Sequence, residues 1–220
     1  MVSHEFRNPL TTIALGTSTL INFLARLPPE KIQQKLQQIM NQVARLEQML
    51  DDLLLVMRAE QGYLEFHPTP TELPTFVSQT VAELREQNHP IHVHLGTDPG
   101  PLLLDQDLLR HILQNLLSNA IKYSPAGSPV RLEVLTTGQV VTLRVEDQGM
   151  GIPPGDQERL FTAYFRASNV GSISGTGLGL KIVKDCVNVH GGTIRVQSAL
   201  GQGTTFLVEL PLRIAAPSTP

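Results

Sequence analysis

Three polar side chains in the middle of the chain share a spacing that could support chemistry on a helix. Asn115, Asn119 and Lys122 stand at i, i+4 and i+7, so a helix places all three on one face over two turns. An amide oxygen is a neutral, hard ligand that suits Mg²⁺, and a lysine ammonium suits a phosphate oxygen. An ordinary solvated helix face has the same spacing, so the spacing alone does not decide between the two interpretations.

A carboxylate followed by spaced glycines forms a second candidate site. Asp147 ends a β-like run, and Gly149 and Gly151 follow it. The carboxylate can accept a hydrogen bond from an exocyclic amine, and the glycines allow the backbone to approach a ring closely. Turns of this kind also arise by chance, so this one gains weight only from its neighbours.

Three further glycines precede an expected helix. Gly175, Gly177 and Gly179 stand at every second position, which places backbone N–H groups where phosphates bind at helix N-termini. The spacing fits neither the dinucleotide-binding fingerprint nor the P-loop, so both of those interpretations are excluded. A flexible loop in front of a glycine-rich helix start is the alternative.

The elements that would position these groups alternate between helices and strands. A helix is predicted over 105–123 with Asp105 as its N-cap, and another from about Gly177 to a C-cap at 191–192. The glycine-, serine- and proline-rich segment 152–176 is too long for an ordinary connection and predicts a functional lid or binding loop. The other predicted elements are an extended segment over 63–70, a helix over 71–87, β-runs over 91–95, 130–137, 139–147, 193–198 and 204–210, and a frayed tail over 213–220.

The first part of the chain follows a different period. Residues 6–27 and 30–57 carry apolar or small residues at alternating spacings of four and three, which is typical of a helical bundle. Pro28 and Pro29 interrupt the pattern, so it predicts a helical hairpin. Two helices leave apolar surface uncovered, and a dimeric four-helix bundle would cover it. A monomeric hairpin packed on the rest of the chain is the alternative.

Composition limits the classes of protein to consider. The chain has 220 residues, of which 41% are hydrophobic and 17% charged, with a net charge of −3. This suits a globular protein and gives no electrostatic footprint for nucleic acid. One cysteine excludes an intramolecular disulfide framework and a multi-cysteine metal site. With no run of 18 apolar residues, we expect no direct membrane contact and a cytoplasmic location for this piece.

Taken together and in this order, the three motifs resemble those of sensor histidine kinases. Five ordered motifs cover residues 2 to about 212: an H box at 3–11, an N box at 115–125, a G1 box at 147–151, an F box from 160–161 to 165–166, and a G2 box at 175–179. The resemblance implies an α+β chain, with a dimerising phosphotransfer hairpin over 1–62 and a Bergerat-type ATP-binding sandwich with a mixed sheet over 63–212.

The resemblance also implies roles for single residues. It makes Asn119 a Mg²⁺ ligand assisted by Asn115, and Asp147 the hydrogen-bond partner of the adenine amine. The remaining residues implied to contact ATP or to shape its pocket are Lys122, Tyr123, Gly149, Gly151, Phe161, Arg166, Gly175, Gly177, Gly179 and Thr204, the last as a support for Asp147. The implied cofactors are therefore ATP and Mg²⁺.

The H box can also be interpreted physically. Phe6 and Leu10 occupy seam positions, so His4 should lie on the exposed flank, where ATP can reach its imidazole. Glu5 can orient the imidazole and take its proton. Asn8 lies one turn further on, and the resemblance associates it with phosphatase activity. A damaged zinc motif and an ordinary surface histidine are alternatives, but Asn8 replaces the second histidine that a zinc site would need.

One position separates kinase from hydrolase in this superfamily. The related ATPases resemble one another in a water-activating Glu four residues before the metal-binding Asn, and here that position is Asn115. Phosphoryl transfer to His4 and then to an aspartate of a response-regulator receiver domain is therefore favoured. A nucleotide-binding regulatory module, or an ATPase without histidine phosphorylation, remains the alternative.

The abrupt start of the sequence gives a further expectation. In the family the acceptor lies well inside its helix, so we expect the preceding half-helix and a sensor to lie outside this sequence. The full protein could then be membrane-tethered. Dimerisation and kinase activity of this piece should be weaker than those of the full protein. The sequence does not indicate the stimulus, the cognate regulator, or whether transfer occurs within or between subunits.

Overall fold

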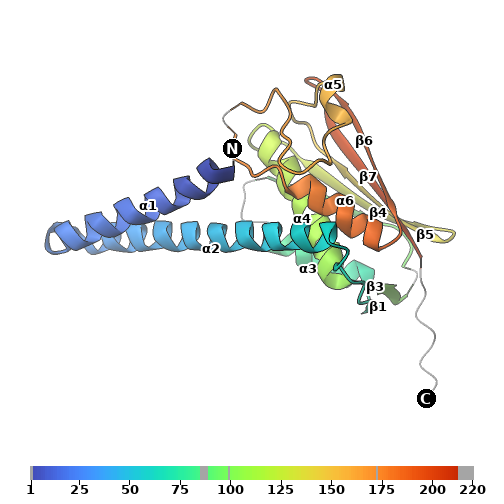
Figure 1. Ribbon diagram of the computed structural model, residues 1–220. Coiled ribbons are helices and arrows are strands. Elements are labelled where there is room, and N and C mark those ends of the chain that lie inside the picture. The colour runs from blue at the N-terminus through green and yellow to red at the C-terminus, as the bar shows by residue number, and fades with distance from the viewer. Residues whose placement is uncertain (1, 85–88, 99, 172, 213–220) are drawn as a thin grey trace, which may run out of the picture.

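The computed structural model describes residues 2–84, 89–98, 100–171 and 173–212, with the backbone alone for residues 2–4. Its N-terminal part, up to Glu60, is a long antiparallel hairpin (Figure 1). Helix α1 spans Val2–Phe23, a short 3-10 turn spans Leu24–Arg26, and α2 spans Pro29–Glu60. Pro28 is extended and Pro29 takes the first position of α2, where its missing N–H costs nothing. The predicted hairpin is thus confirmed, with its turn at the two prolines.

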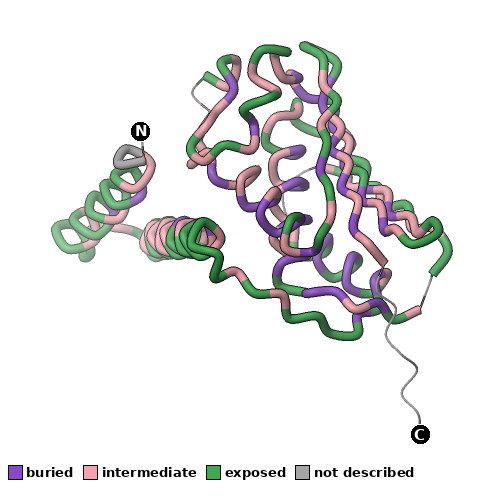
Figure 2. Tube along the Cα trace, turned by 45° about the vertical axis from the view of Figure 1, so that its right-hand side comes forward, coloured by how far each residue is buried: buried purple, intermediate pink, exposed green. Residues whose placement is uncertain are grey.

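The hairpin leaves much of its apolar surface exposed. The two helices contact each other where Gly16 lies against the Ile39 side chain. Leu36 is nevertheless 50% exposed, Met40 61% and Ile21 76%. Figure 2 shows the hairpin projecting from the rest of the molecule with mainly exposed residues. Within one chain, the two helices do not cover their own apolar positions.

The C-terminal half is built on a five-stranded mixed sheet in the order β2-β4-β5-β7-β6. Strands β2 and β4 are parallel and every other neighbouring pair is antiparallel. The strands are β2 Ile91–Leu95, β4 Val130–Thr137, β5 Val140–Glu146, β6 Thr193–Ala199 and β7 Gly203–Pro211. All five coincide closely with the predicted β-runs, because alternating apolar residues and glycine turns mark them.

Three helices cover one face of this sheet (Figure 1), as the sequence predicts. They are α3 Leu73–Leu84, α4 Gln106–Tyr123 and α6 Gly179–Val189. Asp105 caps α4, since its Oδ1 accepts a hydrogen bond from the Leu108 N–H at 3.1 Å. Helix α6 begins two residues later than predicted, which leaves Gly177 in the preceding loop.

Two short elements complete this half of the chain. Strand β1, Thr69–Thr71, pairs antiparallel with β3, Leu102–Leu104, to form a small second sheet. The sequence did not predict β3, because three consecutive leucines show neither helical nor strand periodicity. The predicted lid holds one short helix, α5 Pro154–Gln157, and is otherwise irregular. The tail predicted over 213–220 lies outside the described residues.

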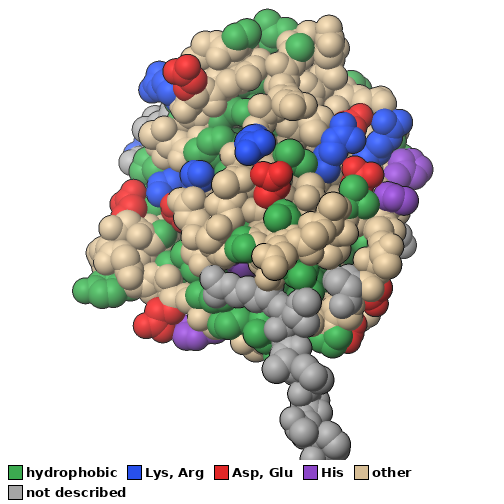
Figure 3. Space-filling model, turned by 90° about the vertical axis from the view of Figure 1, so that its right-hand side faces the viewer, with side chains coloured by type: hydrophobic (Ala, Val, Ile, Leu, Met, Phe, Trp, Pro, Cys, Tyr) green, Lys and Arg blue, Asp and Glu red, His purple; other side chains and the backbone are tan. Residues whose placement is uncertain are grey.

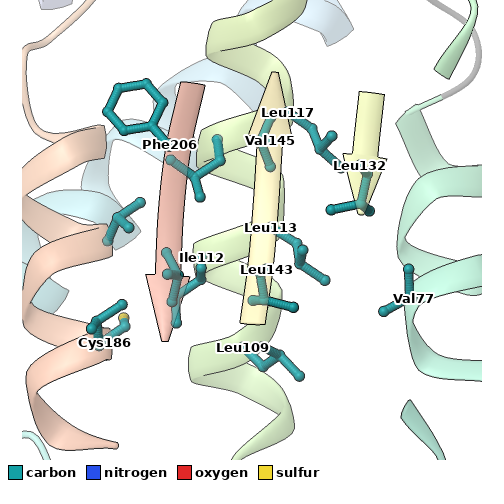
Figure 4. Packing of buried hydrophobic residues seen from close by; sticks show 14 of the residues in the cluster. Val77, Leu109, Ile112, Leu113, Leu117, Leu132, Leu143, Val145, Cys186 and Phe206 are labelled. Atoms are coloured by element: carbon teal, nitrogen blue, oxygen red, sulfur yellow. The ribbon is translucent and has the colours of Figure 1, made fainter. Parts of the chain in front are cut away.

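The hydrophobic core lies between the helices and the sheet. Figure 4 shows Leu109, Leu113 and Leu117 of α4 directed toward Leu132 and Leu143 of the sheet. All five side chains are fully buried. Burying one leucine side chain contributes about 1.5–3 kcal/mol to the stability of the fold. Helix α4 is therefore fixed on its apolar side, which leaves its polar side for the neighbouring cavity.

The end of α2 belongs to this core as well. Val56 is 3% exposed and packs in the same cluster as the α4 and α6 residues. Cys186 of α6 is fully buried, and this burial raises the pKa of its thiol to about 12. A thiol of that pKa stays protonated at neutral pH and serves as a packing group.

The opposite face of the sheet is open to solvent and carries both signs of charge. Figure 3 shows Lys and Arg side chains interspersed with Asp and Glu on this side of the molecule. Arg131 and Arg144 both pair with Glu146, at 3.2 and 2.9 Å. Among the described residues, no helix is long and apolar enough to cross a membrane.

Candidate nucleotide-binding site

A cavity of about 240 Å³ lies between the polar face of α4, the lid and the start of α6. It collects most of the residues that the sequence singled out. Those that line it are Asn115, Asn119, Lys122, Tyr123, Asp147, Gly151, Arg166, Gly175, Gly177, Gly179 and Thr204. Three motifs far apart in sequence thus form one site.

Two amide side chains of α4, those of Asn115 and Asn119, line this cavity. Asn115 Nδ2 donates to the His111 carbonyl at 2.9 Å, so the assigned orientation leaves Oδ1 for the cavity. Lys122 Nζ donates to the Tyr123 hydroxyl at 3.2 Å and lies 4.8 Å from the centre of that ring. These groups offer neutral oxygens and one mobile positive charge, which is a chemistry suited to a metal-bound phosphate chain.

Asp147 is a buried carboxylate at the other end of the cavity. Its Oδ1 accepts hydrogen bonds from the Gly149 N–H at 2.7 Å and from the Thr204 N–H at 3.1 Å. Burial raises the pKa of Asp147, and these two hydrogen bonds oppose that shift. Both contacts that the described part of the chain makes with this carboxylate use Oδ1, so Oδ2 can accept a hydrogen bond from a ligand.

Ser198 supports the strand end that carries Asp147. Its hydroxyl accepts from the Ile152 N–H, donates to the Gly203 carbonyl and contacts the Thr204 hydroxyl, each at 2.9 Å. Thr204 in turn accepts a hydrogen bond from the Asp147 N–H at 2.9 Å. Ser198 was not predicted as a site residue, because a serine in a hairpin strand carries no motif.

The glycines before α6 allow the lid to approach α4 closely. A Cβ at Gly175 would lie 2.6 Å from Lys122 Nζ, and one at Gly179 would lie 2.5 Å from Asn115 Oδ1. Gly177 has a φ of +73°, which side chains rarely adopt. The residue type at these positions therefore sets how near the loop backbone comes to the polar face of α4.

Two predicted site residues do not line the cavity. Phe161 is partly buried against the hydrophobic core, and its neighbour Leu160 lines the cavity instead. Gly149 lies behind the cavity, where a Cβ would be 2.6 Å from the Tyr123 carbonyl oxygen. Its contribution is therefore the N–H that holds Asp147.

Two polar residues outside the five motifs also line the cavity, and neither was predicted. Asn169 of the lid donates from Nδ2 to the Gly151 carbonyl at 2.8 Å. Asp52 reaches the cavity from α2, and burial raises its pKa despite a hydrogen bond from Gln48. Neither belongs to a motif, since each is brought in by the tertiary fold.

The H box lies at the start of α1, next to the lid. The side chain of His4 is outside the described residues, although its backbone is part of α1. Asn8 is exposed. Glu5 Oε2 accepts a hydrogen bond from Ser174 Oγ at 3.0 Å, and Glu5 Oε1 lies 3.7 Å from Arg166 Nη1. The residue that follows His4 thus contacts the loop that covers the cavity.

Comparison with known proteins places both halves of the chain. Residues 104–214 match the family described as "Histidine kinase-, DNA gyrase B-, and HSP90-like ATPase". Residues 1–62 match the "His Kinase A (phospho-acceptor) domain". The chain belongs to the sensor histidine kinase family. It comprises the transmitter module of such a kinase, in which a phospho-acceptor domain is followed by an ATP-binding domain.

Individual kinases are similar along nearly the whole chain. The adaptive-response sensory kinase SasA of Synechococcus sp. (strain JA-2-3B'a(2-13)) is 34% identical over 96% of this chain and 58% of its own length. The sensor-like histidine kinase SenX3 of Mycobacterium bovis is 36% identical over 98% of this chain and 53% of its own length. The chain therefore spans little more than half the length of these relatives.

Solved histidine kinases share the fold. The kinase ShkA, in a structure described as a complex with AMPPNP, is 28% identical with a TM-score of 0.71, over 97% of this chain and 45% of ShkA. Acinetobacter baumannii AdeS, at 23% identity, has a TM-score of 0.71 over 95% of this chain and 98% of its own. The latter likeness concerns the fold alone.

Proposed function

We propose that this chain binds ATP with Mg²⁺ and transfers the γ-phosphoryl group to His4. The observation that carries the proposal is the position of Arg166, which lines the cavity and also lies beside Glu5, the neighbour of His4. A cavity suited to a nucleotide and the phosphoacceptor motif are therefore brought together on one side of the molecule.

The residues lining the cavity divide into two groups for this role. Asp147 would accept a hydrogen bond from the adenine amine, with Tyr123 against the ring. Asn119 and Asn115 would hold Mg²⁺ through their amide oxygens, and Lys122 would contact a phosphate. This donor set fits the ion, because Mg²⁺ prefers oxygen ligands and commonly shares them with nucleotide phosphates. When bound, Mg²⁺ supplies charge neutralisation on the phosphates.

The reaction proposed is an in-line displacement. A ring nitrogen of His4 forms a bond to the γ-phosphorus while the bond to the bridging oxygen breaks, and ADP leaves with that electron pair. The other ring nitrogen of the imidazole gives up its proton, and the carboxylate of Glu5 would accept it. Since position 115 is an amide, it cannot take a proton from water, which supports transfer to histidine over hydrolysis.

The proposed partners follow from the family and from the exposed hairpin. A structure of histidine kinase ThkA in complex with response regulator TrrA exists, at 22% identity to this chain. By analogy, a receiver-domain aspartate would accept the phosphoryl group from His4, and Asn8 would position a water that hydrolyses the regulator's phosphoaspartate. The exposed Leu36 and Ile21 support a second copy as the partner of the hairpin.

Incubation with γ-labelled ATP and Mg²⁺ tests this proposal. Label on the chain that is acid-labile, alkali-stable and absent from His4→Gln is the expected result. Label that survives His4→Gln would contradict the assignment of His4. Free phosphate released without labelled protein would favour the ATPase alternative, and nucleotide binding without either product would favour the regulatory module.

A further inference from the structure

A side-chain network joins the hairpin to the lid of the same chain. Ser174 Oγ donates a hydrogen bond to Glu5 Oε2 at 3.0 Å and accepts one from Arg45 Nη2. Arg45 Nη2 also lies 3.5 Å from Glu5 Oε2. Residues from α1, α2 and the lid therefore meet at one hydroxyl group, 169 residues along the chain from Glu5.

Arg166 completes this network from the cavity side. Its Nη1 lies 3.7 Å from Glu5 Oε1, and its Nη2 donates to the Ile173 carbonyl in the lid. The side chain of Glu5 is only 13% exposed, between two guanidinium groups. The Arg166 side chain is 18% exposed and that of Arg45 42%, so the pair with Arg166 is the less screened by water of the two.

Arg45 and Ser174 lie outside the five motifs. Neither is among the described residues that line the cavity. Their contacts therefore concern where the lid sits and not how the cavity holds its ligand. Ser174 directly precedes Gly175, whose backbone lies against Lys122. A displacement of Ser174 would accordingly move the part of the loop that lies nearest to the phosphate-binding side chain.

We propose that Arg45 and Ser174 are positioning residues that hold the lid of one chain on its own acceptor helix, so that His4 receives the phosphoryl group from ATP bound in the same subunit. This inference rests on the proposed function. The fold of a single chain allows Arg45 and Glu5, the neighbour of His4, to reach Ser174 of the same chain. Misplacing reacting groups by about 1 Å can cost about 100-fold in rate, so loss of this contact should act on transfer.

Substitution of Arg45 tests the positioning role. Arg45→Ala should lower the rate of His4 phosphorylation at saturating ATP by about 10–100-fold, while the affinity for a fluorescent ATP analogue stays unchanged. Ser174→Ala should act in the same direction, and Arg45→Lys should restore part of the rate. The matched control is Arg58→Ala, which removes an exposed arginine from the same helix and should leave both quantities unchanged.

The opposite results would overturn the positioning role. A rate that rises in Arg45→Ala would mean that the network restrains the lid. An unchanged rate would mean that the contact has no part in transfer. A loss of affinity for the ATP analogue equal to the loss of rate would assign Arg45 to nucleotide binding.

Mixed dimers test transfer within one subunit. A tagged His4→Gln chain and a differently tagged Asn119→Asp chain are co-purified and incubated with γ-labelled ATP, beside a mixed dimer of wild type and His4→Gln. We expect no label in the first pair and label on the wild-type chain of the second. If the chain is monomeric, the labelling rate constant should not depend on protein concentration.

The two levels of the proposal can fail separately. Label on the Asn119→Asp chain of the first pair, or a second-order concentration dependence of a monomer, would overturn transfer within the subunit and leave the proposed kinase function intact. A wild-type chain that takes no acid-labile label would overturn the proposed function and this inference with it.

Discussion

The helical hairpin and the α/β sandwich bury their apolar side chains to very different extents. Helix α4 of the sandwich buries eight apolar residues within 18. Within the described part of the hairpin, Met49 and Val56 are the buried large apolar side chains, and Val56 packs in the core of the sandwich. Burial drives folding, so the sandwich is stabilised from within, whereas the hairpin depends on a further surface. Substitutions in the two regions should therefore change different measured quantities.

The largest effect is expected in the core of the sandwich. Leu116 is fully buried, so Leu116→Ala should lower the free energy of unfolding by about 2–5 kcal/mol. Leu15→Ala in the hairpin, at a side chain that is 65% exposed, should change it by less than about 0.5 kcal/mol. Chemical denaturation followed by circular dichroism measures both. Equal losses for the two variants would break the distinction between the regions.

Asp147→Asn should separate stability from binding within the sandwich. The variant has an amide in place of the carboxylate and loses the hydrogen bond that the carboxylate accepts from the ligand. ATP affinity should therefore fall by about 10–100-fold, as measured by calorimetry. Burial raises the pKa of Asp147 in the folded chain. The protonated form of Asp147 therefore stabilises the folded chain. This contribution is complete below the pKa that Asp147 has in the unfolded chain, and it is lost as pH rises through the pKa in the folded chain.

The variant should accordingly become more stable than wild type as pH rises. The amide keeps Oδ1 for the Gly149 and Thr204 N–H groups and carries no charge to bury. Thermal melts of both proteins from acidic to neutral pH measure this difference. A constant difference across that range, or unchanged ATP affinity, would contradict the role given to this carboxylate.

In the hairpin, a charged side chain on the exposed apolar surface should weaken dimerisation. Leu36→Glu places a carboxylate on the exposed apolar surface and should weaken dimerisation by about tenfold or more, which is about 1.4 kcal/mol. Sedimentation equilibrium measures the constant, and Gln33→Glu is the control on the same helix. The melting temperature of the sandwich should not change. Equal effects of the two substitutions would argue against this surface as an interface.

The smallest effect sharpens the comparison inside the sandwich. Ser198→Ala removes the hydroxyl that connects Ile152, Gly203 and Thr204. The loss of unfolding free energy should be about 0.5–1.5 kcal/mol, which is the usual net contribution of a hydrogen bond. Weaker ATP binding should accompany it, because Thr204 holds Asp147. A stability loss with unchanged binding would show that the Asp147 end tolerates this change.

Much of the fold was predictable because local signals and tertiary packing agree. The Asp105 cap and the apolar stripe predict α4 to within one residue, and the mixed sheet follows from its alternating strands. Strand β3 was missed, since Leu102–Leu104 pairs only through a distant partner. The sequence motifs also predict most of the cavity lining, because each motif is short and local.

The remaining site residues could not be predicted for a common physical reason. Asp52, Asn169 and Ser198 reach the site through tertiary packing and carry no spacing pattern of their own. The contact of Arg45 with Ser174 joins segments that are 129 residues apart. Phe161 was assigned to the pocket by its motif, but its side chain lies against the core. A motif gives residue types and order, whereas side-chain direction depends on the packed structure.

Helix α2 has a mechanical consequence for the whole module. It runs without interruption over 32 residues, about 48 Å, from the hairpin turn to Glu60, and Val56 near its end lies in the core of the sandwich. Along this length it carries Arg45 to the lid and Asp52 to the cavity. A rotation or tilt of α2 at the hairpin would therefore displace the lid, the cavity and the core together. The size of that displacement would depend on the length of the helix.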